Sequence, residues 1–438
     1  MERVLQPVLA GLVAAVVGFA GAFAVVLAGL QAVGADPGQA ASGLLAVSIA
    51  SGVVAIALGL WWRTPVVIAW STPGAALLVT AGPQPGGFAA AVGAFLLCGL
   101  LIIVTGMIAP LGRLVAAIPG HLAGAMLAGV LLPLCLTPVR ALAQVPLLAA
   151  PVIVGWALVA RFARPWAVPA ALVVAIAVIL WTGGMPAGAA APAFVWTTPT
   201  FDPATLVGVG LPLFVVTMVS QNVTGMAVLA QYGFRPPWRP VLLVTGAATV
   251  VSAPVGGHAV NLAAISAALA AGPDAGPAQR RWIASITNGA VLAVLGLTAG
   301  LATAVFAASP PLLVEAVAGL ALLGALASSM ASAVAEPDGR EAAAVTFVVT
   351  AAGVGFLGLG AAFWGLVAGA ALTLLRRPGR TSRPTRAFRR SELRANPRAD
   401  RPPPRGASGE PDYQLPEDDL RFDAAGDAPR RTRRQGRT

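Results

Sequence analysis

Residues 65–79 read PVVIAWSTPGAALLV, and residues 250–270 read VVSAPVGGHAVNLAAISAALA. Each stretch is apolar, yet each contains Ser-x-Pro followed by small residues, at 71–74 and at 252–257. An α-helix needs about 20 uninterrupted apolar residues to cross a bilayer core, and these stretches are too short or too broken for that. Because they lie at comparable places in the two halves of the chain, they predict two half-helices of an inverted repeat with a site near the midplane.

The composition predicts a membrane protein. Of the 438 residues, 57% are hydrophobic and 10% are charged, whereas a soluble domain carries about 25% charged residues. Apolar stretches recur from Val8 to Leu375, and many approach the length of a spanning helix. We therefore expect an all-α polytopic membrane protein. The first stretch, 8–30, is longer than the roughly 7–15 apolar residues of a signal peptide, so we expect it to be retained.

Length and turn signals divide the chain into about 14 apolar segments, of which the third and tenth are the half-helices. The segments cover residues 7–31, 42–62, 65–79, 87–110, 114–136, 145–162, 166–183, 203–230, 240–252, 255–271, 282–308, 311–331, 341–354 and 357–375. The expected parts are a first repeat (1–183), an extracytoplasmic connection (184–202), a second repeat (203–375) and a polar tail (376–438).

The arginines indicate the orientation, since cytoplasmic loops hold the excess of positive charge. If the N-terminus is inside, all arginines before residue 376 except Arg140 fall on cytoplasmic connections. We therefore expect an inner-membrane protein with both termini in the cytoplasm. The tail holds 17 of the 28 basic residues and 9 of the 17 acidic residues. Its Pro-rich, mixed-charge sequence is typical of a disordered extension rather than a nucleic-acid-binding domain.

The half-helices favour an anionic ligand. A proline in the first turn of a helix costs no hydrogen bond, and the free N–H groups there attract negative charge. We expect these ends near 71–74 and 256–258. No arginine lies within an apolar span, so two facing helix ends are the predicted anion site. A carboxylate or another small anion fits this site, and a neutral polar ligand remains open.

The eighth segment carries a polar stripe. Thr217, Ser220, Gln221 and Thr224 share one helix face, and Asn222 is adjacent. These side chains either bond neighbouring helices or line a cavity, and a dense stripe beside two half-helices favours the cavity.

Three ionisable residues lie well inside apolar segments, and such residues are functional hypotheses. They are His121, His258 and Glu315. We interpret His121 as an interface group. Glu315 is either a carboxylate at a helix start or a proton carrier, whereas His258, directly after Gly256 and Gly257, is the first candidate for proton coupling. Cys98 and Cys135 have no metal-ligand spacing, so we expect no metal and no cofactor.

The motifs resemble those of the benzoate/proton symporter (BenE) family. They are WSTPGAAL (70–77), SQNVTGMAVL (220–229), YGF (232–234), GGHAVNLAAISAAL (256–269), GPDA (272–275) and Arg281-Trp282. The resemblance extends to about residue 375, and Gly276 departs from the histidine expected there. It implies a seven-plus-seven inverted repeat like that of the uracil/xanthine permeases and sulfate transporters, and import of a small aromatic carboxylate such as benzoate together with protons.

With this resemblance, we expect the substrate to bind among twelve residues. They are Trp70, Ser71, Thr72, Gly74, Ser220, Gln221, Asn222, Thr224, Gly256, Gly257, His258 and Asn261.

Three other functions are weaker. Nucleobase permeases place acidic residues on the eighth and tenth segments, where this chain has Gln221, Asn222 and His258. A sulfate-type exchanger would carry a folded C-terminal domain, for which the tail is too poor in apolar residues. A membrane enzyme would need clustered carboxylates or metal ligands, and the spans hold one carboxylate, Glu315. The sequence leaves homodimer formation open.

The topology can be tested with reporter fusions. A reporter fused after Thr438 should be active in the cytoplasm, and one inserted at Ala187 should be active outside, because the arginines then lie on cytoplasmic loops. Either reporter on the opposite side would contradict the predicted orientation.

Overall fold

The computed structural model describes residues 2–108, 110, 119–182, 191, 193–308, 312–356 and 360–375. Residues 1–377 form one compact unit. Ala187, most of the first half of the expected connection 184–202, and the tail 376–438 lie outside the described residues.

The described residues are mostly helical, because a helix satisfies its own backbone hydrogen bonds inside a bilayer. The helices of the first half are α1 (Glu2–Ala32), α2 (Pro37–Trp62), α3 (Thr72–Ala81), α4 (Gly87–Met107), α6 (Gly120–Cys135), α7 (Thr137–Gln144), α8 (Pro146–Phe162) and α9 (Ala167–Thr182). Those of the second half are α10 (Pro203–Thr205), α11 (Leu211–Thr217), α12 (Thr224–Gln231), α13 (Trp238–Ser252), α14 (Ala264–Ala271), α15 (Trp282–Gly296), α16 (Ala299–Ala308), α17 (Leu313–Val334), α18 (Arg340–Ala351) and α19 (Ala361–Leu375).

Shorter turns join or interrupt these helices. The 3-10 turns are η1 (Arg164–Trp166), η4 (Ala253–Val255), η5 (Pro273–Ala275), η6 (Ala278–Arg280) and η7 (Pro337–Gly339). Two π-helical turns, η2 (Leu206–Gly210) and η3 (Met218–Val223), lie within the helical stretch from α10 to α12.

Within the described part of the chain, eight helical stretches are long and apolar enough to cross a membrane. A ninth is added if the pair 278–296 and 299–308, bent by 55°, forms one span. Shorter apolar helices, α3, α8 and α19 among them, accompany these stretches. This mixture of long and short apolar helices is that of a multi-pass membrane protein.

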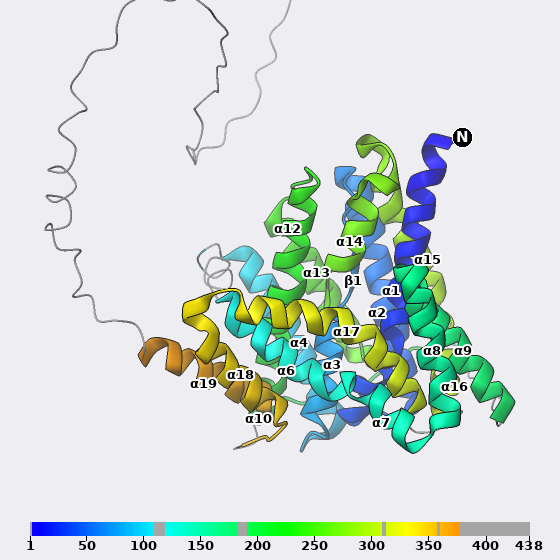
Figure 1. Cartoon of the computed structure of the whole chain (residues 1–438). Coiled ribbons are helices and arrows are strands. Elements are labelled where there is room, and N and C mark those ends of the chain that lie inside the picture. The colour runs from blue at the N-terminus through cyan, green and yellow to red at the C-terminus, as the bar shows by residue number, and fades with distance from the viewer. Residues whose placement is uncertain are drawn as a thin grey trace, which may run out of the picture. The chain divides into compact units, whose positions relative to one another are not determined.

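Two short strands pair at the centre of the unit, and we call this pair the strand crossing. β1 (Ile68–Trp70) pairs antiparallel with β2 (Val260–Leu262), and Ala69 lies opposite Asn261. β1 leads into α3, and β2 leads into α14. In Figure 1, α14 runs from this crossing towards the end where the N-terminus lies, and α3 runs the other way. The two short helices predicted in the third and tenth segments are therefore present, and they start from one strand pair.

One predicted boundary is wrong. The sequence placed the second half-helix start at Gly256–His258, but α14 begins at Ala264. Pro254 lies in the turn η4 that ends α13, whereas Pro73 lies in the first turn of α3. The two Ser-x-Pro motifs thus occupy different places: Ser71 follows β1 and is the N-cap of α3, and the residue in the same place after β2 is Ala263, the N-cap of α14, rather than Ser252.

Glycine pairs bring the long helices of the two halves together. α2 packs on α15, and α4 packs on α13. A Cβ atom added at Gly289 of α15 would lie 2.5 Å from the Gly52 carbonyl oxygen of α2. The pair Gly99 and Gly246 is similar, since a Cβ at Gly246 would lie 2.9 Å from the Gly99 oxygen. Backbones at this separation leave no room for a side chain, so these crossings depend on glycine.

Replacement of one crossing glycine should therefore destabilise the fold. Gly289→Ala forces α2 and α15 apart and should cost about 1–3 kcal/mol, the range for overpacked cores. Gly324→Ala is the matched control, because a Cβ there meets nothing within 4 Å and alanine favours the helix. Thermal unfolding in detergent should show a lower midpoint for Gly289→Ala only. Equal midpoints for the two variants would contradict this packing.

Candidate functional site

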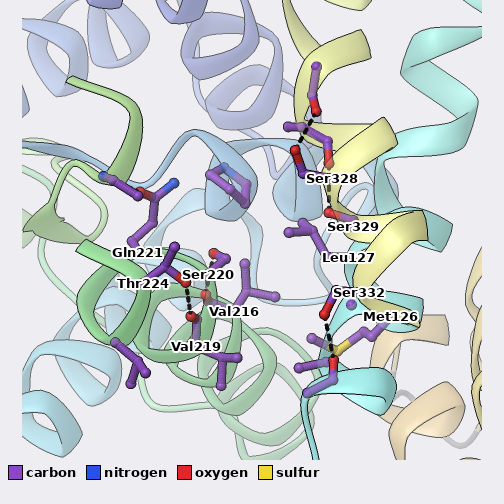
Figure 2. A pocket seen from close by; sticks show the side chains of 18 residues that line it. Met126, Leu127, Val216, Val219, Ser220, Gln221, Thr224, Ser328, Ser329 and Ser332 are labelled. Atoms are coloured by element: carbon purple, nitrogen blue, oxygen red, sulfur yellow. Dashed lines mark hydrogen bonds between the residues drawn. The ribbon is translucent and has the colours of Figure 1, made fainter. Parts of the chain in front are cut away.

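A cavity of about 560 Å³ lies between two groups of helices. One wall comes from α3, from the stretch between α11 and α12, and from the start of α14; the other comes from α6 and α17 (Figure 2). The cavity is lined by Pro73, Gly120, Ala123, Gly124, Met126, Leu127, Val216, Val219, Ser220, Gln221, Val223, Thr224, Ala264, Gly324, Ala325, Ser328, Ser329 and Ser332. Its volume falls within the roughly 300–1,000 Å³ of small-molecule sites.

The cavity wall is apolar apart from a few neutral polar groups. On one wall, Ser220 donates to the Val216 carbonyl at 2.5 Å, and Thr224 donates to the Val219 carbonyl at 2.9 Å. The facing wall carries three serines of α17, Ser328, Ser329 and Ser332, which Figure 2 places across the cavity from Ser220 and Thr224. Among the residues that the structure describes, no charged side chain lines this cavity.

Both short helices start at the cavity, but their first turns differ. The Ser71 hydroxyl accepts from the Gly74 N–H at 3.1 Å and caps α3, and the Thr217 hydroxyl donates to Ser71 at 2.9 Å. No side chain caps α14 from the N-cap residue Ala263. Instead, the Ala264 N–H donates to the Gln221 side-chain oxygen, Oε1, at 3.3 Å. The positive end of the α14 dipole therefore meets the cavity with only the Gln221 amide beside it.

A second cavity of about 200 Å³ adjoins the first. The two share Pro73, Gln221, Ala264 and Ala325. The second cavity is lined further by a face of α1 and by residues of α9, α15 and α17, together with Trp70 and Thr72. Trp70 is held edge-on against Phe19 with ring centroids 5.8 Å apart.

Five of the twelve predicted substrate-binding residues line a cavity. They are Trp70, Thr72, Ser220, Gln221 and Thr224. The other seven, Ser71, Gly74, Asn222, Gly256, Gly257, His258 and Asn261, are absent from both linings.

The remaining predicted residues support the strand crossing instead. Asn222 accepts from the Leu262 N–H at 3.0 Å, because the π-helical turn η3 directs its side chain into the core. Asn261, oriented to accept from the Ser71 N–H at 2.9 Å, ties β2 to the start of α3. A Cβ added at Gly74 would lie 2.5 Å from the Leu213 side chain. These groups hold the starts of α3 and α14 in place without lining either cavity.

The Gly256-Gly257 segment also lies away from the cavities. Gly256 has a φ of +88°, which favours glycine, and its carbonyl oxygen packs against Gly43. A Cβ at Gly257 would lie 2.6 Å from the Ser252 side chain, so a side chain there would disturb the end of α13 rather than fill a cavity.

The three ionisable candidates occupy different places. His258 is fully buried, and its Nε2 lies 3.2 Å from the Ser71 carbonyl oxygen. Glu315 lies in the first turn of α17, where its own carbonyl accepts from the Thr137 hydroxyl at 2.8 Å. His121 Nδ1 lies 3.1 Å from a Glu336 carboxylate oxygen, and its Nε2 is buried without a partner among the described residues, so its role as an interface group stays a prediction.

Sequence reasoning missed the serines of α17. Ser328, Ser329 and Ser332 follow i, i+1 and i+4 in the apolar C-terminal half of α17, a spacing that places polar groups on one side. This pattern could have indicated the second wall of the cavity.

The family follows from a comparison with family models. Residues 3–375 match the model of BenE, "Benzoate membrane transport protein". The chain belongs to this family. Two bacterial relatives agree over the same length. "Inner membrane protein YdcO" of Escherichia coli is 37% identical over 82% of this chain and 93% of its own length. "Benzoate membrane transport protein" of Acinetobacter baylyi is 32% identical over 83% of this chain and 93% of its own length.

Solved structures share the fold of this BenE-family chain. The transmembrane domain of the cyanobacterial bicarbonate transporter BicA matches with a TM-score of 0.54 at 18% identity, over 84% of this chain and 98% of that chain. Murine Slc26a9 in the inward-facing state matches with a TM-score of 0.55 at 13% identity, over 86% of this chain and 68% of that chain. The Acinetobacter baylyi relative and both solved structures are named as transport proteins, and this chain is a multi-pass membrane transporter of small anions.

The division of the polar stripe can be tested by stability. Asn222→Ala leaves the buried Leu262 N–H without its acceptor, which should cost about 1–3 kcal/mol. Ser220→Ala is the control, because its hydroxyl donates only to a carbonyl of its own helix. The unfolding midpoint in detergent should fall for Asn222→Ala and stay within error for Ser220→Ala. A larger fall for Ser220→Ala would show that the assignment is wrong.

Proposed function

We propose that this protein is a secondary active transporter that imports benzoate or a similar small aromatic carboxylate together with protons. The observation that carries the proposal is the cavity at the start of α14, which has neutral polar walls and a helix N-terminus whose N-cap residue, Ala263, offers no side-chain cap and whose first N–H bonds only the Gln221 amide. The name of the Acinetobacter baylyi relative adds benzoate as the substrate.

The carboxylate would bind at the start of α14. A helix N-terminus carries about half a positive charge, and its first N–H groups are donors for an anion. Gln221 lies beside Ala264, and its amide nitrogen is a further donor. Thus an anion can be held without a lysine or arginine, which keeps its binding weak enough for release.

The aromatic ring would lie against the apolar walls. Met126 and Leu127 of α6 and Val216 and Val219 of α11 and η3 line the larger cavity, and Figure 2 shows them facing it. Burial of an aromatic ring against such side chains contributes affinity roughly in proportion to the apolar area removed from water. Selection for an aromatic acid over a small inorganic anion would come from this surface.

The direction of opening follows from the proposed topology. The larger cavity extends from Pro73 and Ala264 to Gly120, at the start of α6, and Ser332, near the end of α17. With both chain termini in the cytoplasm, these ends face the cytoplasm, so we infer an inward-open conformation. We also propose two repeats, 1–183 and 203–375, related by inversion, as in uracil/xanthine permeases. Two helix contacts support this. α2 of the first repeat packs on α15 of the second, and α4 of the first packs on α13 of the second, so each repeat contributes one early and one late helix to these contacts.

A nucleobase or other small-anion permease of the same fold is the second candidate. Paired helix ends would also bind a neutral ring or an inorganic anion. Acidic side chains that could pair with ring N–H groups are absent from both cavity linings, which favours the carboxylate.

The carboxylate site can be tested by filling it. Ala264→Leu adds bulk at the first residue of α14, where the two cavities meet, so benzoate binding should weaken at least tenfold. Ala268→Leu, one turn later and outside both linings, is the control. Equilibrium binding of labelled benzoate to purified protein measures both. Wild-type affinity in folded Ala264→Leu would contradict the proposed position.

Proton coupling would compensate the charge of the substrate. An aromatic acid has a pKa near that of Glu, about 4.3, so it is an anion at neutral pH. An inside-negative potential opposes its entry by about 2.3 kcal/mol per 100 mV. Import therefore needs an accompanying cation, and a proton taken up with the anion makes the combined step neutral.

We propose His258 as the coupling residue, acting through Ser71. Its Nε2 contacts the Ser71 carbonyl oxygen, one residue before α3. Its Nδ1 is buried and has no hydrogen-bond partner among the described residues. A proton there would gain electrostatic stabilisation from an anion bound at the helix ends, so anion and proton would strengthen each other's binding by the same factor. Glu315 is the alternative carrier.

The variant His258→Gln separates a proton-coupling role of His258 from a structural one. Gln still donates to the Ser71 carbonyl but cannot titrate, so the variant should bind benzoate with an affinity that no longer depends on pH. It should also fail to accumulate benzoate in response to a pH gradient. If it concentrates benzoate with wild-type pH dependence, His258 is only structural, and Glu315→Gln becomes the variant to measure.

A further inference from the structure

One residue that lines the second cavity has a buried polar atom without a hydrogen-bond partner among the described residues. Asn288 of α15 is 2% exposed and lines this cavity. Its Oδ1 is buried and accepts no hydrogen bond from any described residue. A carboxamide offers two donor hydrogens and an acceptor oxygen, and a buried one left unpaired destabilises the fold. The neighbouring Ser285, by contrast, donates to the Ala55 and Val66 carbonyls. Asn288 therefore stands apart from the polar groups that hold the helices together.

Most residues that line the second cavity with Asn288 are apolar, and Thr72, Gln221 and Ser266 are the other polar ones. Leu292, one turn along α15, lines the same cavity, as do Leu322 of α17 and the α1 residues Ala14, Ala15, Val17, Gly18, Gly21 and Ala22. An aromatic ring fits such walls, and Asn288 is a hydrogen-bonding group set among them. An unpaired amide in an apolar cavity favours a ligand that is apolar except at one point.

The second cavity continues from the proposed carboxylate site. Pro73, Gln221 and Ala264 belong to both linings. A carboxylate at the start of α14 can direct its ring into either cavity. An unsubstituted ring lies against the apolar wall of the larger cavity, and a hydroxylated ring can enter the second cavity, towards the wall that holds Asn288. A hydroxyl group both donates and accepts, so it can pair with the oxygen or the nitrogen of the amide, whichever faces the ring.

We infer that Asn288 is a specificity-determining residue that hydrogen-bonds a hydroxyl group on the ring of the transported aromatic carboxylate. This inference rests on the proposed function. It narrows the substrate class from aromatic acids in general to hydroxylated ones, which a site with a buried hydrogen-bonding group distinguishes from unsubstituted analogues.

Equilibrium binding of benzoate and of 2-, 3- and 4-hydroxybenzoate to the purified full chain tests the inference. Wild-type protein should bind at least one hydroxybenzoate about tenfold more tightly than benzoate. Asn288→Leu, which keeps the size and removes the hydrogen bonds, should lose this preference while its benzoate affinity changes less than threefold. Leu292→Met is the control, because it alters the apolar wall of the same cavity without a polar group, and it should shift all four affinities alike.

The outcomes separate this inference from the proposed function. Wild-type protein that binds benzoate but prefers no hydroxybenzoate overturns the role of Asn288, even if Asn288→Leu does not fold. A preference that persists in Asn288→Leu also overturns it, because another group must then bind the hydroxyl. Wild-type protein that binds none of the four acids overturns the proposed function itself.

Discussion

The rest of the structure depends on hydrogen-bond partners for the non-helical backbone of β1 and β2, which lies in the middle of a membrane protein. A bilayer offers no water to an unpaired N–H or C=O group, and each such group costs several kcal/mol. Here the antiparallel pairing of β1 with β2 supplies partners on one edge of each strand. Two side chains supply others: the Thr249 hydroxyl accepts from the Val260 N–H at 2.9 Å, and Asn222 accepts from Leu262. The crossing is therefore held by α13 and by the π-helical turn η3.

This requirement divides the polar residues into two groups. Asn222, Thr249, Thr217 and Ser71 are committed to the backbone or to each other, so they fix the starts of α3 and α14. Ser220, Gln221, Thr224 and the serines of α17 face the cavity. The start of α3 is capped by its own N-cap residue Ser71, whereas the first N–H of α14 bonds the Gln221 amide, a group that lines the cavity, so we expect the attraction for an anion to be concentrated at α14. The proposed carboxylate position follows from this asymmetry.

The sequence predicted the membrane class, the two interrupted segments and the polar stripe, because hydropathy, proline and helical spacing are local signals. It misplaced the start of α14, since Ser-x-Pro at Ser252 resembles the motif at Ser71 but ends one helix instead of beginning another. Which residues of the stripe face the cavity could not be read from a regular helical period, because η3 shifts the register by its π-helical turn. Asn222 therefore points into the core.

Residues that meet only in three dimensions were the hardest to predict. Ser328 and Ser332 can be recognised as cavity residues only because they face Ser220 and Thr224, which are about 100 positions away in the chain. Likewise, His258 follows two glycines at a position that suggests a helix start, but it packs behind Ser71 and against Phe95 with ring centroids 6.4 Å apart. The residues next to His258 therefore predicted the segment in which it lies, but not the side chains that surround it.

The central claim is that this cavity carries an aromatic carboxylate across the membrane with protons. The most direct test is uptake of labelled benzoate by proteoliposomes under an imposed pH gradient, acidic outside, with protein-free liposomes as the baseline because neutral benzoic acid crosses lipid unaided. The account predicts accumulation above this baseline, saturation with benzoate and loss of accumulation with a protonophore. Uptake equal to that of protein-free liposomes, or protein-dependent uptake that ignores the gradient, would contradict it.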